Sequence, residues 1–356
     1  MRYWPRAFLV RALATIAAYP LAGSGAARAD ASASGAPGAP LTLSRLVPDG
    51  VARVYADGAA GGRRVFIEDG RGRTFGLRVS GQADLHLEET ERPAPAERRS
   101  KMLPDGVVAR GALNIRAAWL ADPTTRYAHG VLGDAIEAEG VAVETADGRI
   151  LELRLPADSV FEDRYPRLAD IDGDGDDEIL IVRSYLDRGS ALAVIKVQTD
   201  GLAIVAETPA LGRANRWLNP VGGGDFAGDG GIEVALVETP HIGGVLKLYR
   251  WRDGQLAASA AHPGVTNHVI GSRALGLSAI LDANGDGIPD LLIPDQSRRR
   301  LLVLTYAGNR FAQIAAIPHS SPVVTDLAVA DLDGNGVADA VYALANGTVV
   351  ALLFGR

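Results

Sequence analysis

The stretch Asp170-Ile-Asp-Gly-Asp-Gly-Asp-Asp-Glu178 carries acidic side chains at alternate positions, with glycines between them. Three further segments align with it without gaps, and their first residues follow at spacings of 55, 57 and 49 positions. These segments are Asp225-Phe-Ala-Gly-Asp-Gly-Gly-Ile-Glu233, Asp282-Ala-Asn-Gly-Asp-Gly-Ile-Pro-Asp290 and Asp331-Leu-Asp-Gly-Asn-Gly-Val-Ala-Asp339. A motif that recurs at a near-constant period indicates a repeat architecture, in which one supersecondary unit is used several times.

Short apolar runs precede and follow each acidic loop, as Pro166–Ala169 and Ile179–Val182 do around the first. The runs are too short for helices and are punctuated by glycine, so each loop is expected to join two strands. A second mark has the same period, because turn glycines recur every 53, 53 and 54 residues, at Gly148, Gly201, Gly254 and Gly308. Each of these glycines predicts a second hairpin. Four antiparallel strands in about 50 residues make one blade of a β-propeller.

The predicted fold is therefore all-β, a single propeller domain over residues 41–356 with six four-stranded antiparallel blades, and seven blades as the alternative. Upstream of the first acidic loop we expect a blade without the motif, with Ala117–Ala121 as its first strand, and a further irregular blade within residues 51–112. The last repeat ends after its third strand. Because an open ring would leave exposed strand edges, Leu41–Leu46 is expected to complete that blade.

Oxygen-bearing side chains occupy positions 1, 3, 5 and 9 of the nine-residue loops, with Ala227 as the exception, and suit calcium, which takes six to eight oxygen ligands. Glycines at positions 4 and 6 permit the sharp turn, and the backbone carbonyl at position 7 would add a ligand. The sequence predicts up to four structural calcium sites, with these ligands: Asp170, Asp172, Asp174, Asp176, Glu178, Asp225, Asp229, Glu233, Asp282, Asn284, Asp286, Ile288, Asp290, Asp331, Asp333, Asn335, Val337 and Asp339.

An EF-hand and a plain Asp/Gly-rich turn are two other interpretations of these loops. An EF-hand needs a bidentate glutamate at position 12, where this chain has Ile181, Leu236, Ile293 or Tyr342, so that interpretation fails. Plain Asp/Gly-rich turns are common in β proteins, but four copies at a regular spacing favour metal binding. The copies are unequal, because Ala227 replaces a ligand at position 3 of the second loop, and that site is predicted to be weak.

These four loops resemble the FG-GAP and VCBS repeats of bacterial exported proteins and of integrin α-subunit propellers. The resemblance covers about residues 110–356 and implies a propeller with structural calcium in the loops between the first two strands of each blade. The chain departs from the family pattern in lacking the Phe-Gly and Gly-Ala-Pro strings themselves. It also has no recognisable acidic loop in its first two blades.

The loops at the opposite ends of the strands are rich in arginine, histidine and aromatic residues. Such groups suit an anionic or sugar-like ligand through charge-assisted hydrogen bonds and ring stacking. The alternative is that the aromatic residues pack between blades and the arginines pair with Glu162 and Asp163. The candidate ligand-binding residues are Arg164, Arg167, Arg183, Tyr185, Asn215, Trp217, His241, Asn267, His268 and Arg273.

Composition and motifs limit the functional classes. The net charge of −7 argues against a nucleic-acid partner, and the lack of cysteine excludes disulfides and thiolate metal sites. The sequence contains no Gly-x-Ser-x-Gly, His-Glu-x-x-His, P-loop or dinucleotide motif. We therefore expect a non-enzymatic recognition or scaffold module that binds a protein, a glycan or a small anion. A polysaccharide lyase or hydrolase and a purely structural envelope protein are the alternatives.

The N-terminus has the order of a secretory signal peptide. Basic residues come first, the apolar run Ala7–Ala22 follows, and Ala27-Arg-Ala29 supplies small residues before a cleavage point. A membrane anchor and a mispredicted start are the alternatives, and Arg11 interrupts the apolar run. No other stretch of the chain has the roughly 20 apolar residues needed to span a bilayer. We expect residues 1–29 to be removed, residues 30–40 to be a flexible leader, and the mature protein to be periplasmic or secreted.

Overall fold

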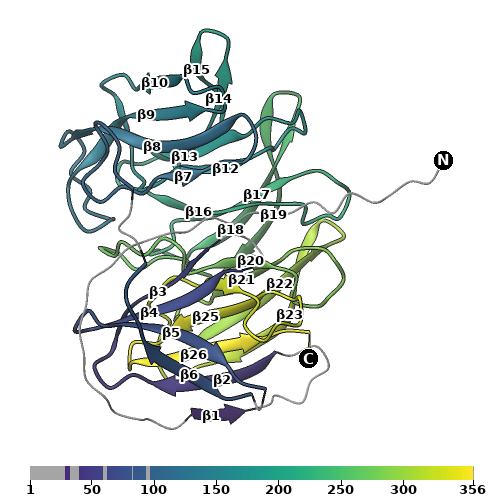
Figure 1. Cartoon of the computed structure of the whole chain (residues 1–356). Helices are drawn as coiled ribbons and strands as arrows, with labels where there is room; N and C mark the ends of the chain where they lie inside the picture. Colours follow the sequence, from purple (N-terminus) through teal and green to yellow (C-terminus); the bar gives the residue numbers. More distant parts are fainter. Residues whose placement is uncertain (1–28, 33–39, 59–61, 82, 94–96, 356) are drawn as a thin grey trace.

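The computed structural model describes residues 29–32, 40–58, 62–81, 83–93 and 97–355, and within these ranges the chain forms strands and turns without a helix (Figure 1). The all-β prediction is confirmed. The described residues likewise include no helix long and apolar enough to cross a bilayer. Residues 1–28 of the predicted signal peptide and residues 33–39 of the predicted leader lie outside the described residues.

Within the described residues, 24 of the 26 strands group into six four-stranded antiparallel blades, as predicted, and β1 and β11 are additional to them. Blade 1 is β3 (Val51–Asp57), β4 (Arg64–Asp69), β5 (Thr74–Val79) and β6 (Leu85–Glu89); blade 2 is β7 (Ala109–Arg110), β8 (Ile115–Thr124), β9 (Glu137–Thr145) and β10 (Ile150–Arg154). Blade 3 is β12 (Arg167–Ala169), β13 (Glu178–Tyr185), β14 (Gly189–Gln198) and β15 (Gly201–Glu207); blade 4 is β16 (Leu218–Gly224), β17 (Glu233–Glu238), β18 (Val245–Arg252) and β19 (Gln255–Pro263). Blade 5 is β20 (Ala279–Leu281), β21 (Asp290–Pro294), β22 (Arg300–Ala307) and β23 (Arg310–Pro318); blade 6 is β24 (Ala328–Ala330), β25 (Asp339–Ala343), β26 (Thr348–Leu353) and β2 (Leu41–Leu46).

Blade 2 corrects one expectation. Ala117–Ala121 lies within β8, the second strand of this blade, and the first strand is the two-residue β7. Blade 2 has no acidic loop to mark the boundary between its first two strands, and two residues are too few to show a periodicity. The short strand β11 (Ser159–Phe161) pairs with both β9 and β13, so it links blades 2 and 3 into one nine-stranded sheet.

The N-terminal and C-terminal parts of the chain meet in blade 6. Strand β2 pairs antiparallel with β26 over its whole length, from Leu41 opposite Leu353 to Leu46 opposite Thr348, which confirms the predicted closure (Figure 1). Strand β1 (Ala29–Ser32) pairs in turn with β2, although the small residues of the leader gave no reason to expect a strand there. The ring is therefore closed by hydrogen bonds between segments far apart in the sequence.

The core lies between successive blades. In β13, Ile179 and Ile181 pack in an apolar cluster with residues of blade 2, whereas Leu180 and Val182 pack in another with residues of blade 4. Side chains alternate across a strand, so a blade buried on both faces needs an uninterrupted apolar run. This is why Ile179–Val182 reads as four apolar residues in succession.

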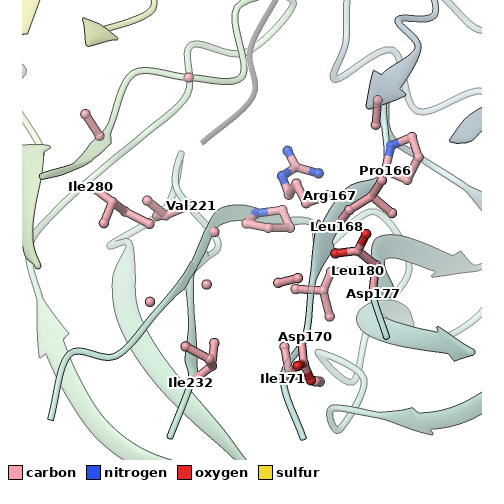
Figure 2. A pocket seen from close by; sticks show the side chains of 18 of the residues that line it. Pro166, Arg167, Leu168, Asp170, Ile171, Asp177, Leu180, Val221, Ile232 and Ile280 are labelled. Atoms are coloured by element: carbon pink, nitrogen blue, oxygen red, sulfur yellow. The ribbon is translucent and has the colours of Figure 1, made fainter. Parts of the chain in front are cut away.

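The first strand of each blade lines a central cavity of about 1050 Å³ that residues of all six blades border. Leu168 and Leu180 lie on one side of it and Val221 and Ile280 on the other, so its middle is apolar (Figure 2). Asp170 lies at its wall near the acidic loops, and Arg167 lies further along the same wall. The acidic loops and the opposite face are thus at two ends of one channel.

Candidate metal centres and the opposite face

The acidic loops connect the first and second strands of blades 3 to 6, and hydrogen bonds within each loop fix its shape. The carboxylate of Asp170 accepts the N–H of Gly173 at 2.7 Å and that of Gly175 at 3.0 Å. Asp282 and Asp331 accept the equivalent amides at 2.7 to 2.9 Å. Gly173 and Gly175 have φ of 78° and 91°, a conformation that favours glycine. The motif is therefore a defined loop structure and not only an acidic composition.

The acidic residue at position 9 starts the second strand and is fully buried in every copy. One of its oxygens accepts the N–H at position 2, as Glu178 does from Ile171 at 2.9 Å and Asp339 from Leu332 at 2.8 Å. Burial raises the pKa of Glu178 to about 7 and that of Asp339 to about 6. Burying a carboxylate without a compensating cation costs free energy, so a positive charge near this position would stabilise the fold.

The structure brings two of the predicted ligand sets together. Ligand atoms of Asp170, Asp172 and Asp174 lie within 4.8 Å of one another, and so do those of Asp331, Asp333 and Asp339. Across the described residues no other three acidic or histidine side chains meet this closely. The predicted ligands of the other two loops are Asp225, Asp229 and Glu233 in blade 4, and Asp282, Asn284, Asp286 and Asp290 in blade 5.

The remaining predicted ligands lie at positions 5 and 7. The N–H of Asp176 donates to Asp174 at 3.0 Å, that of Ile288 to Asp286 at 2.8 Å, and that of Val337 to Asn335 at 2.7 Å. These bonds occupy the amides of position 7 and leave its carbonyls for other partners.

Two basic residues that the sequence reasoning missed lie among these carboxylates. Lys196 in β14 contacts the loop of blade 3, and Arg250 in β18 contacts that of blade 4. The only sequence signal for Lys196 is a single charge inside the apolar run Ala191–Val197, which reads equally well as an exposed position. Assigning it to the loop requires the pairing of β13 with β14.

The opposite face carries the loops between the second and third strands and the connections between blades. Residues 125–136, which we call the capping segment, join β8 to β9 and reach across this face. Within it, Tyr127 accepts the N–H of Asn215 at 3.1 Å, Val131 accepts that of Gly271 at 2.8 Å, and Asp134 accepts Arg273 at 2.8 Å. The segment thus connects blade 2 to the loops that enter blades 4 and 5.

Most candidate ligand-binding residues are covered or already paired. Arg164, Tyr185, Trp217, Asn267 and His268 are all buried. Burial lowers the pKa of His268 to about 3, and that of His241, with His129 nearby, to about 4. Both histidines are therefore neutral near pH 7 and bring no charge to an anion.

Several of the candidate ligand-binding residues form hydrogen bonds with other side chains of the protein. Arg183 donates to Glu207 at 3.0 Å, and Tyr185 donates to the same carboxylate at 2.5 Å. The rings of His241 and His268 are bonded at 2.9 Å. In a further pair, Arg167 donates to Asp163 at 2.6 Å. Of the ten candidates, the residues that present exposed side chains are Asn215 and Arg273.

A buried polar network beneath the capping segment also escaped the sequence reasoning. Glu162 contacts His129 at 2.6 Å, accepts a short hydrogen bond from Ser184, and its backbone carbonyl accepts the Trp217 indole N–H at 3.1 Å. Glu137 is buried nearby with no hydrogen-bond partner, and burial together with the charge of Glu162 raises its pKa to about 10. Burial therefore opposes ionisation of Glu137 beside the Glu162 carboxylate.

The comparison with protein families supports the repeat assignment. Residues 282–342, which run from the acidic loop of blade 5 into β25 of blade 6, match the model of an FG-GAP-like repeat. No curated protein matches the chain. The matched stretch holds two of the four acidic loops, and the other two repeat the same loop in the same place in the blade. Residues 282–342 are therefore an FG-GAP-like repeat, and they lie in a chain with the all-β fold of a β-propeller.

Proposed function

We propose that the protein is an exported, calcium-stabilised β-propeller that serves as a recognition or scaffold module. The observation that carries the calcium proposal is the preformed loop, repeated in four blades, that ends in a buried carboxylate. Export is proposed from the basic, apolar and small residues of positions 1–29.

The loop of blade 5 shows how calcium fits the residues present. Asp282, Asn284 and Asp286 offer side-chain oxygens, Ile288 its carbonyl, and Asp290 a carboxylate. Asp290 accepts the Ala283 N–H through one oxygen at 3.0 Å, while its other oxygen is buried without a hydrogen-bond partner. A bound calcium ion would neutralise these acids and satisfy that oxygen. Asp331, Asp333, Asn335, Val337 and Asp339 offer the corresponding set in blade 6.

Removing calcium is expected to lower the melting temperature by several degrees. An ion that binds only the folded state stabilises it by about 2.7 kcal/mol per site at 100 times its Kd. Differential scanning calorimetry of the mature chain in calcium and in EDTA measures the shift, and magnesium at the same concentration is the control. An identical melt in calcium and in EDTA would contradict the calcium proposal.

The recognition surface is proposed on the loops of blades 3 to 5 at the opposite face. Leu186, Ile242 and Ile270 belong to these loops and are 39%, 62% and 66% exposed. The bond between His241 and His268 holds the loops of Ile242 and Ile270 next to each other. Exposed apolar side chains near a charged group such as Arg273 support a protein partner.

Replacing Ile242 by glutamate is expected to reduce retention of that partner at least 10-fold, because central apolar residues carry most of the binding energy at interfaces. The measurement is a quantitative pull-down from an envelope extract. Ile314→Glu is the matched control, since Ile314 is 44% exposed on β23, away from these loops. Equal retention by both variants would exclude this surface. Release of unsaturated or reducing ends from a polysaccharide panel would instead favour the alternative enzyme function.

A further inference from the structure

A lysine occupies the centre of the most acidic loop. Lys196 follows Ile195, which pairs with Ile179, so it lies beside Glu178 at the end of the loop. Its ammonium group is 2.7 Å from Asp172, 2.7 Å from Asp174 and 3.3 Å from Glu178. These carboxylates are at positions 3, 5 and 9, the side chains that would face a bound ion. Lys196 is only 20% exposed, so this is a partly buried cluster and not a surface ion pair.

Blade 4 has the same arrangement with an arginine. Arg250 pairs with Glu233 in the β17–β18 ladder, and its guanidinium contacts Asp229 at 2.6 and 2.7 Å and Glu233 at 3.2 Å. The loop is adapted to it, because a Cβ at position 7 would lie 1.8 Å from the guanidinium, and Gly231 has none. The other three loops carry a side chain at this position.

Blades 5 and 6 have no charge at the equivalent point of the third strand. The residue beside Asp290 is Thr305, which follows Leu304, the partner of Leu291. The residue beside Asp339 is Leu353, which follows Leu352, the partner of Ala340. Asp290 and Glu178 each have a buried oxygen without a hydrogen-bond partner, but that of Glu178 lies 3.3 Å from the Lys196 ammonium, whereas no ion pair among the described residues includes Asp290.

We infer that the four loops form two classes. In blades 3 and 4 the side chain of Lys196 or Arg250 takes the place of calcium, whereas the loops of blades 5 and 6 bind the calcium ion. This inference rests on the calcium proposal above. A divalent ion cannot share three carboxylates with an ammonium or guanidinium group, because the two cations repel each other and compete for the same oxygens. The most acidic loop of the chain, that of blade 3, is therefore not its strongest calcium site.

The division places calcium at the point where the ring closes. Blade 6 contains both β2 and β26, and its apolar cluster continues into blade 1. Calcium would hold the first two strands of blade 6 and of its neighbour blade 5 together. Blades 3 and 4 keep the same loop shape at any calcium concentration.

The test is calcium stoichiometry, measured by isothermal titration calorimetry on the mature chain. The wild type is expected to bind two ions. Lys196→Thr installs the residue that blade 5 carries at this register and is expected to bind three, whereas Thr305→Lys is expected to bind one. Circular dichroism of each variant establishes folding. For the Lys196→Thr variant, calcium should also restore the melting temperature that the substitution lowers.

Each outcome has a defined meaning. Three or four ions in the wild type, or two in a folded Lys196→Thr variant, would overturn the division while leaving calcium binding in place. A wild type that binds no calcium would overturn the proposed calcium role and the division together. If Thr305→Lys does not fold, Lys196→Thr still decides the question, since it predicts one additional ion.

Discussion

Replacing Leu43 by alanine is expected to destabilise the protein by about 2–5 kcal/mol, the usual cost of truncating a buried leucine. Leu43 lies in β2 opposite Ala351 and is 1% exposed. It belongs to the apolar cluster that joins blade 6 to blade 1, with Val54 and Val341 among its members. The cavity would therefore open where the two parts of the chain close the ring. Urea unfolding followed by tryptophan fluorescence measures the effect.

Leu46→Ala is the matched control, because Leu46 lies in the same strand but is 48% exposed. Its expected cost is within about 0.5 kcal/mol, as for most surface substitutions. Similar destabilisation by the two variants would mean that β2 contributes through its backbone pairing alone. The packing role of Leu43 in ring closure would then be wrong.

The repeats were predictable because their information is local. Acidic residues and glycines at fixed positions specify the loop through hydrogen bonds that span no more than seven residues, as between Glu178 and Ile171. The closure by Leu41–Leu46 was also predictable, because the last repeat lacked one strand and an unpaired strand edge in the ring would be open to pairing with other chains. The first strand of blade 2 was not, because β7 is only two residues long.

The site was predictable only where its parts are close in sequence. Lys196 lies 18 residues after Glu178, and only the β13–β14 register brings the two together. The burial of Trp217 and His268 depends on loops from several blades, including the capping segment. The sequence around each of these residues has no pattern that predicts this burial. Arg167 pairs with Asp163, which is the alternative that the sequence left open for this arginine.

The ion pair between Asp163 and Arg167 predicts a second large effect on stability. Asp163→Asn is expected to destabilise the protein by about 3–5 kcal/mol, because removing one partner of a buried ion pair leaves the other charge uncompensated. Asp163 is 1% exposed in its side chain and Arg167 10%, and their atoms are 2.6 Å apart. Arg167 would keep its contact with the Tyr165 carbonyl at 3.3 Å and its position over the Tyr165 ring. Neither contact supplies a full negative charge.

Asp187→Asn makes the same chemical change in an exposed pair, since Asp187 and Arg188 are 73% and 46% exposed, and it is expected to cost at most about 1 kcal/mol. Adding Arg167→Met to Asp163→Asn removes the stranded charge and is expected to recover part of the loss. Chemical denaturation of the three variants separates the explanations. If the double variant is less stable than Asp163→Asn alone, then Arg167 contributes mainly through its packing against Tyr165. If instead the double variant is more stable, the uncompensated guanidinium is the source of the loss, and Arg167 serves the fold of blade 3 and not an external ligand.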